Sequence, residues 1–175
     1  MSAPLSSSPA APLSSHPSER AFSWQEIHIL SLALAEKLKA SGRSWTRIIA
    51  VTRGGMVPAC IIARELDIRL VDSISIESHA HQTRGDVHIR SQPDLHYNQI
   101  DTLVIDDLSD SGNTFKAIRA LWPQATYACL FVKPEGQPQA DYFVEHIAQN
   151  CWVYLPWESQ EFPDHITRQI GAHLL

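Results

Sequence analysis

Two neighbouring carboxylates, Asp106 and Asp107, directly follow the apolar run Leu103 to Ile105. That run is typical of a strand buried on both faces of a parallel sheet, and ligands bind beyond the carboxyl ends of such strands. Carboxylate oxygens at that edge can accept hydrogen bonds from sugar hydroxyls. Adjacent strand residues point to opposite sides, so we expect the two acids to do different work and the chain to turn after them.

The small polar loop after these acids leads into a predicted helix at residues 115–121. Backbone N–H groups and hydroxyls gathered at a helix N-terminus bind phosphate. The acids and the loop together therefore predict a site for a sugar phosphate. The alternative is a solvated turn whose polar residues only cap the helix. The loop residues in question are Asp110, Ser111, Gly112, Asn113 and Thr114.

Three other acidic or phosphate-binding motifs do not fit this stretch. A phosphatase nucleophile motif needs Asp-x-Asp, whereas Asp106 and Asp107 are adjacent. A Walker loop needs Gly-Lys-Ser/Thr, which is absent here. A receiver domain places its acidic pair near the start of the domain, whereas here a long stretch of chain precedes the pair.

Two further segments are expected at the same sheet edge. The loop from Thr52 to Met56 follows a short apolar strand, and its two glycines allow the backbone to approach a ligand closely. Lys133 follows the predicted buried strand Thr126 to Val132. An isolated lysine at such a place is usually just solvated, but this one lies at the same edge as Asp106. We therefore expect it to face the ligand.

The elements that position these loops alternate between strand and helix, which predicts an α/β fold with a mostly parallel central sheet flanked by helices. Ser23 and Glu26 form a capping box at the first helix, and Ser41-Gly42 ends it. The expected helices are residues 23–40, 57–66 and 115–121, and the expected strands are residues 47–51, 70–76, 103–105 and 126–132.

Composition limits the function classes. With 175 residues, 44% hydrophobic content and a net charge of -5, the chain can bury one domain and lacks the basic excess of a nucleic-acid binder. Its three cysteines, Cys60, Cys129 and Cys151, adjoin apolar residues and are expected to be buried thiols in a reducing compartment. No apolar run is long enough for a membrane span, so we expect a soluble cytoplasmic protein, with peripheral membrane contact left open.

Two segments are expected to lack regular structure. Residues 1–21 are rich in Ser and Pro and predict a disordered tail before a single domain at residues 22–175. Residues 77–99 form a long polar stretch, which is typical of a mobile lid over an active site. A zinc site at His79 and His81 is the alternative, but no Cys or carboxylate in this stretch lies at ligand spacing.

From Phe22 to Glu158 the chain resembles the xanthine-guanine phosphoribosyltransferases, a family of type I purine phosphoribosyltransferases. Residues 103–114 are similar to the family's PRPP-binding loop, and Val51 to Asp72 to its first loop, helix and strand. Ser109, Ser111 and Asn113 depart from the usual pattern, though Asn113 tolerates a left-handed φ and should keep the turn. The resemblance implies the type I fold, with a small hood over the base site.

The resemblance implies purine salvage: guanine or xanthine, and hypoxanthine more weakly, react with PRPP to give GMP, XMP or IMP and pyrophosphate. Mg2+ would bridge ribose hydroxyls and pyrophosphate, with Asp107 as the carboxylate near the metal and Asp106 as a ribose ligand. Arg53 and Gly54 would form a cis peptide that contacts pyrophosphate. Arg84 and Arg90 of the lid are further candidates for that contact, and neither is preferred. Residues 110–114 would bind the ribose phosphate.

On the base side, the resemblance gives each of four residues a role. Lys133 would donate to the 6-oxo group, Asp110 would be the general acid/base at N7, and Trp152 would stack on the purine. The carbonyl of Val153 would accept from the 2-amino group. A tryptophan in such a β-prone segment is more often part of the core than a binding platform.

Two other functions remain open at this point. One is a hypoxanthine-guanine phosphoribosyltransferase, because Tyr154 and Glu158 depart from the acidic residues usual there and leave the ranking of bases undecided. The other is a regulatory protein of the same fold that senses PRPP or a nucleotide and binds RNA or DNA, which the acidic net charge disfavours. Family members are typically homotetramers, so we expect a homo-oligomer.

Overall fold

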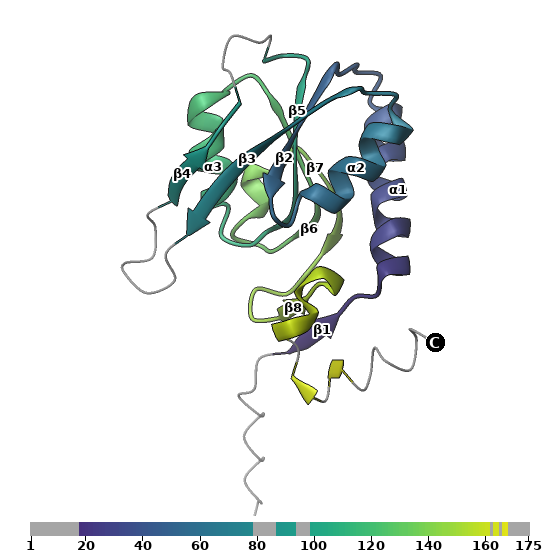
Figure 1. Cartoon of the computed structure of the whole chain (residues 1–175), viewed down its shortest axis with the longest axis vertical. Coiled ribbons are helices and arrows are strands. Elements are labelled where there is room, and N and C mark those ends of the chain that lie inside the picture. Colours follow the sequence, from purple (N-terminus) through teal and green to yellow (C-terminus); the bar gives the residue numbers. More distant parts are fainter. Residues whose placement is uncertain (1–17, 79–86, 94–98, 162, 165, 168–175) are drawn as a thin grey trace, which may run out of the picture.

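Strands and helices alternate along most of the chain, as Figure 1 shows. The computed structural model describes residues 18–78, 87–93, 99–161, 163, 164, 166 and 167. The strands are β1 (Glu19–Ala21), β2 (Arg47–Thr52), β3 (Leu70–Ser78), β4 (Val87–Ser91), β5 (Thr102–Ser109), β6 (Thr126–Val132), β7 (Tyr142–His146) and β8 (Trp152–Tyr154). The helices are α1 (Trp24–Ala40), α2 (Met56–Glu65) and α3 (Asn113–Leu121), with short 3-10 helices η1 (Gln137–Gln139) and η2 (Pro156–Glu161).

Six of the described strands form one sheet in the order β4-β3-β2-β5-β6-β7. All neighbouring pairs are parallel except β3 and β4. The predicted parallel sheet is therefore confirmed, and β6 has the predicted bounds. Because β2, β5 and β6 run in the same direction side by side, the loops that follow them meet at one edge of the sheet.

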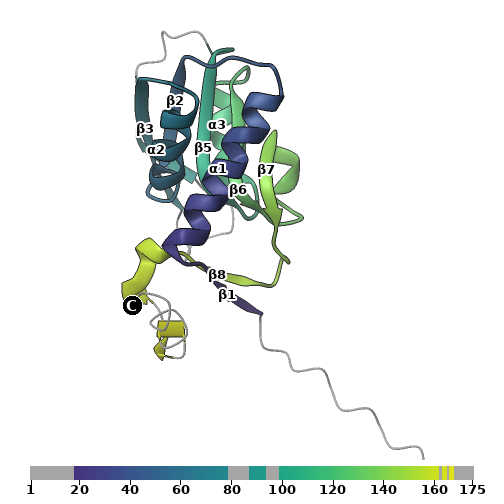
Figure 2. The ribbon, with the colours of Figure 1, turned by 90° about the vertical axis from the view of Figure 1, so that its right-hand side faces the viewer.

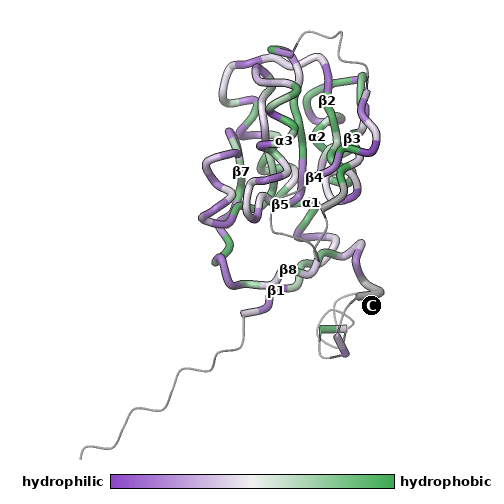
Figure 3. Tube along the Cα trace, turned by 90° about the vertical axis from the view of Figure 1, so that its left-hand side faces the viewer, coloured by the Kyte–Doolittle hydropathy of each residue, from purple (hydrophilic) through white to green (hydrophobic). Residues whose placement is uncertain are grey.

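Helices cover both faces of this sheet. Figure 1 shows α1 and α2 on one side and α3 on the other. In β2, Ile48 and Ala50 pack with α1 and α2, whereas Ile49 and Val51 pack with α3. Successive strand residues point to opposite faces, so a strand covered on both sides is apolar throughout. Figure 3 shows this hydrophobic colouring along the central strands.

The start of α1 follows its predicted capping box. The backbone N–H of Glu26 donates to Ser23 Oγ at 3.2 Å, and the backbone N–H of Ser23 donates to Glu26 Oε2 at 2.7 Å. Two of the helix's unpaired N–H groups are thereby satisfied. At the other end Ser41 is the C-cap and Gly42 has φ +71°, as expected for a glycine that ends a helix.

A second, two-stranded sheet lies below the main one, next to the start of α1 (Figure 2). It consists of β1 and β8 in parallel, and we call β1, β8 and η2 the hood. Trp152 N donates to Ser18 O at 2.7 Å, and Phe22 N donates to Tyr154 O at 3.0 Å. The expectation that residues 19–21 belong to the tail is thus wrong, because pairing with a distant strand satisfies their backbone groups.

The polar stretch 77–99 contains regular structure that sequence analysis did not predict. β3 continues to Ser78, and β4 pairs with it in antiparallel register. The alternating residues Val87-His88-Ile89-Arg90 suit an edge strand, and Ile89 packs against the core on the α3 face. The lid was predicted for all of residues 77–99, and the zinc alternative for His79 and His81. Residues 79–86 and 94–98, which include both histidines and Arg84, lie outside the described residues, whereas Arg90 lies on β4.

Cysteine burial matches the prediction at two of three positions. Cys129 and Cys151 are buried free thiols, whereas Cys60 is exposed. α2 buries the face that carries Ala59 and Ile62, and Cys60 lies away from that face. None of the described helices is long and apolar enough to cross a membrane.

Candidate active site

Two cavities adjoin at the carboxyl edge of the sheet. One, the hood cavity, measures about 410 Å³ and lies between the sheet edge and the hood. The other, the sheet-edge cavity, measures about 450 Å³ and lies between the loops after β2 and β5. Asp107, Leu108 and Glu158 line both, so a single ligand can extend from one into the other.

The two acids lie inside β5 rather than after it. The ladder between β5 and β6 continues to the pair Ser109 and Val132, and the bend begins only at Asp110. The expectation that the chain turns directly after the acids is therefore wrong. Because the strand continues, the acids differ in environment: Asp106 is buried at 8% exposure, whereas Asp107 is half-buried and lines both cavities.

Burial shifts both acids toward the protonated form. Desolvation raises the pKa of Asp106 well above its usual range, and the charge on Asp107 adds to the rise. Desolvation raises the pKa of Asp107 to about 6, with a contribution from the charge on Glu158. Backbone N–H groups compensate in part, since Leu108 N donates to Asp107 Oδ1 at 2.6 Å and Asp107 N to Asp106 Oδ1 at 2.9 Å. A cation beside these carboxylates would stabilise their charged forms.

The oxygen donors at the sheet-edge cavity fit a hard divalent cation. Asp106, Asp107 and Glu158 all line this cavity. Among the described residues no group of three His, Cys, Asp or Glu side chains is arranged to hold a metal by itself. Mg2+ is commonly bound by one or two carboxylates, with water and ligand phosphates completing the shell. The site therefore suits a metal that arrives with an oxygen-rich ligand.

The loop after β2 contacts the acids of β5 directly. A Cβ at Gly54 would overlap the Asp107 carboxylate, and a Cβ at Gly55 would overlap the carbonyl oxygen of Ile105. The two glycines are thus required by contact with β5, not only by a ligand as predicted. The cis peptide joins Thr52 to Arg53, so the expected cis bond between Arg53 and Gly54 is wrong by one residue. Arg53 is exposed and lines the sheet-edge cavity.

The loop after β5 turns at a glycine. Gly112 has φ +79° and is the N-cap residue of α3, while Asn113 is already the first helical residue. The prediction that Asn113 takes a left-handed φ is therefore wrong, because Gly112 makes that turn. Ser111 is exposed, and its Oγ lies 3.5 Å from Asn113 N. Thr114 faces the sheet-edge cavity at the start of α3, and the first backbone N–H groups of a helix can bind an anion because they lack partners within the helix.

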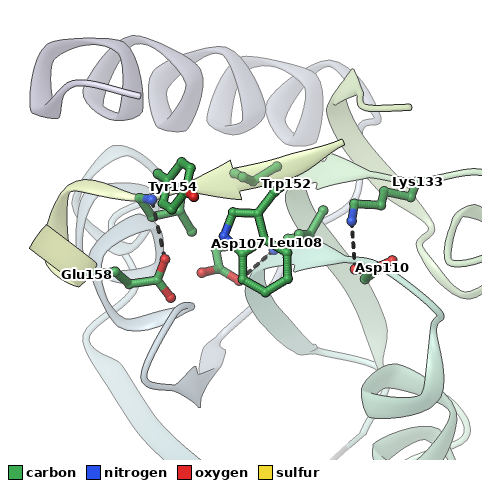
Figure 4. Close-up of a pocket in the computed structure, with 9 residues that line it drawn as sticks. Asp107, Leu108, Asp110, Lys133, Trp152, Tyr154 and Glu158 are labelled. Atoms are coloured by element: carbon green, nitrogen blue, oxygen red, sulfur yellow. Dashed lines mark hydrogen bonds and ion pairs between the residues drawn. The ribbon is translucent and has the colours of Figure 1, made fainter. Parts of the chain in front are cut away.

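Lys133 and Asp110 form an ion pair at the hood cavity, as Figure 4 shows. Lys133 Nζ lies 2.7 Å from Asp110 Oδ2, and the side chains are 7% and 52% exposed respectively. The lysine is therefore not simply solvated, in agreement with the expectation that it faces the site. The Lys133 ammonium can donate to an acceptor on the edge of a flat ring, and the Asp110 carboxylate beside it can face an ionisable nitrogen on the same edge.

The hood presents an aromatic surface to this cavity. Trp152 on β8 is 60% exposed, and its ring contacts that of Tyr154 at a centroid distance of 6.4 Å. Tyr154 is buried, and its hydroxyl donates to Glu19 Oε1 at 3.2 Å. Burial raises the pKa of Tyr154 above its ordinary value. Trp152 is thus available for stacking and not part of the core.

The structure brings most of the predicted residues together around the two cavities, but Ser111, Gly112 and Asn113 line neither. Asp107, Asp110, Lys133, Trp152 and Val153 line the hood cavity, and Arg53, Gly54, Asp106, Asp107 and Thr114 line the sheet-edge cavity. Sequence analysis missed Leu108, which lines both, and Gln149, which contacts Asp110. Leu108 lies within the stretch 103–114 that resembles the PRPP-binding loop, directly after the acids, whereas Gln149 lies in no motif.

Comparison with known proteins adds independent findings. Residues 21–154 match the family model described as "Phosphoribosyl transferase domain". The chain is 42% identical over 154 residues to the xanthine-guanine phosphoribosyltransferase of Ruegeria sp. (strain TM1040), covering 81% of this chain and 88% of that protein. It is 40% identical over 136 residues to the xanthine-guanine phosphoribosyltransferase of Chromohalobacter salexigens, and the match covers 78% of this chain and 82% of that protein. The crystal structure of a purine phosphoribosyltransferase from Pyrococcus horikoshii Ot3 superposes with a TM-score of 0.69 at 28% identity, covering 83% and 96%.

Proposed function

Since the chain belongs to the xanthine-guanine phosphoribosyltransferases, we propose that it joins N9 of guanine or xanthine to C1 of PRPP and releases pyrophosphate, using hypoxanthine more weakly. The family membership confirms the type I fold and the enzyme class that the sequence predicts. The observation that carries the choice of base is the ion pair of Lys133 and Asp110 in a cavity that Trp152 lines.

In this proposal the hood cavity binds the base. The Lys133 ammonium donates to the 6-oxo oxygen, and Asp110 faces N7 as general acid/base. On a purine these two atoms are neighbours, which agrees with side chains whose charged atoms are 2.7 Å apart. Trp152 stacks on the ring, and the carbonyl of Val153 accepts from the 2-amino group. Stacking does not select among bases, so Lys133 supplies the preference for a 6-oxo group.

The sheet-edge cavity binds PRPP. The loop from Asp110 to Thr114 binds the ribose phosphate, since it ends at the N-terminus of α3. Asp106 accepts from ribose hydroxyls, and Arg53 with Gly54 contacts pyrophosphate. Because the loop after β2 lies directly against Asp107 of β5 at Gly54, the groups that bind the two ends of PRPP are held in a fixed relation.

We propose Mg2+ as the cofactor, with Asp107 as the protein carboxylate nearest to it. When bound with PRPP, the metal stabilises negative charge on the departing pyrophosphate. The carboxylates of Asp107 and Glu158, on the wall shared by both cavities, would hold the cation there. The transition state at C1 resembles an oxocarbenium ion, and carboxylates near the ribose stabilise its positive charge.

We propose that the protein assembles into a homo-oligomer, with the tetramer common in the family as the expectation. A groove of about 540 Å³ lies beside α2 and shares no lining residue with the hood cavity or the sheet-edge cavity. Met56 and Cys60 on α2 and Val71 on β3 line it, and Met56, Cys60 and Val71 are exposed. Light scattering coupled to size-exclusion chromatography tests the assembly. Action in the cytoplasm, with or without peripheral membrane contact, stays a prediction.

A steady-state assay of pyrophosphate release tests the function, with guanine, xanthine, hypoxanthine and adenine, with and without Mg2+. We expect turnover of guanine and xanthine, weaker turnover of hypoxanthine, none of adenine, and dependence on Mg2+. Loss of xanthine turnover together with strong hypoxanthine turnover would instead indicate a hypoxanthine-guanine enzyme. Sequence-selective RNA binding without pyrophosphate release from any base would indicate a regulatory protein.

A further inference from the structure

Gln149 lies on the connector that leads from the main sheet into the hood. Ile147 N donates to Val132 O at 2.8 Å, which anchors the start of this connector to β6. Cys151 N donates to Ala148 O at 3.0 Å and closes a turn just before β8. Gln149 sits within that turn, so its side chain is held between the sheet and the strand that carries Trp152.

The Gln149 amide makes two hydrogen bonds to two different loops. Its Nε2 donates to Asp110 Oδ1 at 2.9 Å, and its Oε1 accepts from the backbone N–H of Glu135 at 3.0 Å. Glu135 lies in the loop after β6, two residues beyond Lys133. The amide therefore bridges the loop of the base-binding lysine and the loop of the proposed acid/base.

The orientation of this amide follows from its partners. A backbone N–H can only donate, so the amide oxygen must face Glu135. The NH2 group is then directed at the Asp110 carboxylate, which can only accept when ionised. With Lys133 on Oδ2 and Gln149 on Oδ1, each oxygen of Asp110 has its own donor.

These contacts matter when the base binds. The Asp110 side chain is 52% exposed, and Lys133 is its other hydrogen-bond donor. In the proposed function Lys133 also donates to the 6-oxo group, which weakens its hold on Asp110 during the reaction. We propose that Gln149 is a positioning residue that keeps the Asp110 carboxylate directed at N7 while Lys133 serves the base. This inference rests on the proposed function.

A merely structural role would act through Glu135, by holding the loop after β6 in place. The variant Gln149→Glu separates the two roles. It keeps an oxygen that accepts from the Glu135 N–H, but it replaces the donor at Asp110 with an ionised oxygen of like charge. Gln149→Leu removes both contacts. Gln124→Glu makes the same change of charge at an exposed position at the opposite end of β6 and serves as the matched control.

The experiment measures kcat and KM for guanine and PRPP from pH 5 to pH 8, with thermal unfolding of each variant. We expect Gln149→Glu to lower kcat at least tenfold at pH 7.5, with KM for PRPP within about twofold of wild type and Tm little changed. The deficit should shrink toward pH 5, because the introduced carboxyl, with an ordinary pKa of about 4.3, regains a proton to donate. Gln149→Leu should lose kcat without this recovery, and Gln124→Glu should behave as wild type.

The outcomes separate this inference from the function itself. An active wild type with unimpaired Gln149→Glu overturns the positioning role and leaves the function standing. A deficit that is the same at every pH, or one that appears only in KM for guanine, assigns Gln149 to loop structure and also overturns it. A wild type that releases no pyrophosphate from any base overturns the proposed function and this inference together.

Discussion

The two cavities are built by different parts of the molecule. Strands and loops of the six-stranded sheet form most of the sheet-edge cavity, where Gly54 packs so closely on β5 that an added Cβ would overlap the Asp107 carboxylate. The hood cavity is bounded by the hood, whose strands β1 and β8 have three residues each. Trp152, the largest side chain that lines this cavity, is mostly exposed. Tight packing tolerates little change, whereas an exposed wall tolerates more. We therefore expect PRPP binding to be the less adaptable half of the site, and base selection the more adaptable.

The largest effect should come from Asp110→Asn in the hood cavity. We expect kcat to fall about a hundredfold or more, because the amide can neither move the N7 proton nor stabilise charge there. PRPP affinity should persist, since the sheet-edge cavity is unchanged. Single-turnover kinetics check the loss of turnover, and PRPP titration checks the unchanged PRPP affinity. An unchanged kcat would remove Asp110 from catalysis.

Lys133→Met should have the next largest effect, and it should change only the affinity for the base. The variant keeps most of the stem but deletes the donors, which leaves the 6-oxo group unpaired at a cost of about 1.5 to 3 kcal/mol. Affinity for guanine, xanthine and hypoxanthine should fall together, while PRPP affinity should hardly change. If titration instead showed weaker PRPP and unaltered guanine binding, Lys133 would belong to the phosphate side and the division between the cavities would fail.

Gly54→Ala should disturb the other cavity. Its Cβ would displace the Asp107 carboxylate, and overpacking of this kind costs about 1 to 3 kcal/mol. We expect KM for PRPP to rise roughly tenfold, with guanine binding little affected. Gly42→Ala is the control: no atom lies within 4 Å of the new Cβ, and Gly42, unlike Gly54, has a positive φ that an alanine would strain. It should lower Tm slightly and leave KM unchanged. Equal kinetic effects of both substitutions would argue against a role for close packing at Gly54.

The smallest effect concerns stability. Burial raises the pKa of Asp107 from 3.8 to about 6, so the folded protein binds the proton more tightly than the unfolded chain. Stability should therefore fall as pH rises from about 4 to 6 and then level off. Asp107→Asn should raise the free energy of unfolding at pH 7 by up to about 2 kcal/mol in EDTA and reduce this pH dependence, leaving the part that the raised pKa of Asp106 contributes. Urea unfolding at pH 4 and pH 7 measures the free energy of unfolding of both proteins. A variant less stable than wild type at pH 7 would contradict the raised pKa of Asp107.

Sequence patterns predicted the parts of the fold whose causes are local. The capping box at Ser23, the continuous apolar strand from Thr126 to Val132 and the meeting of the loops at one edge of a parallel sheet are all confirmed. Each follows from neighbouring residues or from a repeat of two or 3.6 residues. The predictions that failed concern exact positions, such as the cis bond at Thr52 and the turn at Gly112, because several backbone arrangements are compatible with the same glycine-rich sequence.

The sequence by itself determined the chemistry of this protein: paired acids next to a buried apolar run, a polar loop at a helix start, and a lysine at the end of the neighbouring strand. Tertiary structure decided what those groups touch. Glu19 and Tyr154 are 135 residues apart in the chain yet share a hydrogen bond in the hood, and Gln149 meets Asp110 from a segment with no motif. Such contacts leave no local pattern, because they depend on strand pairing and loop packing that only the whole fold brings about.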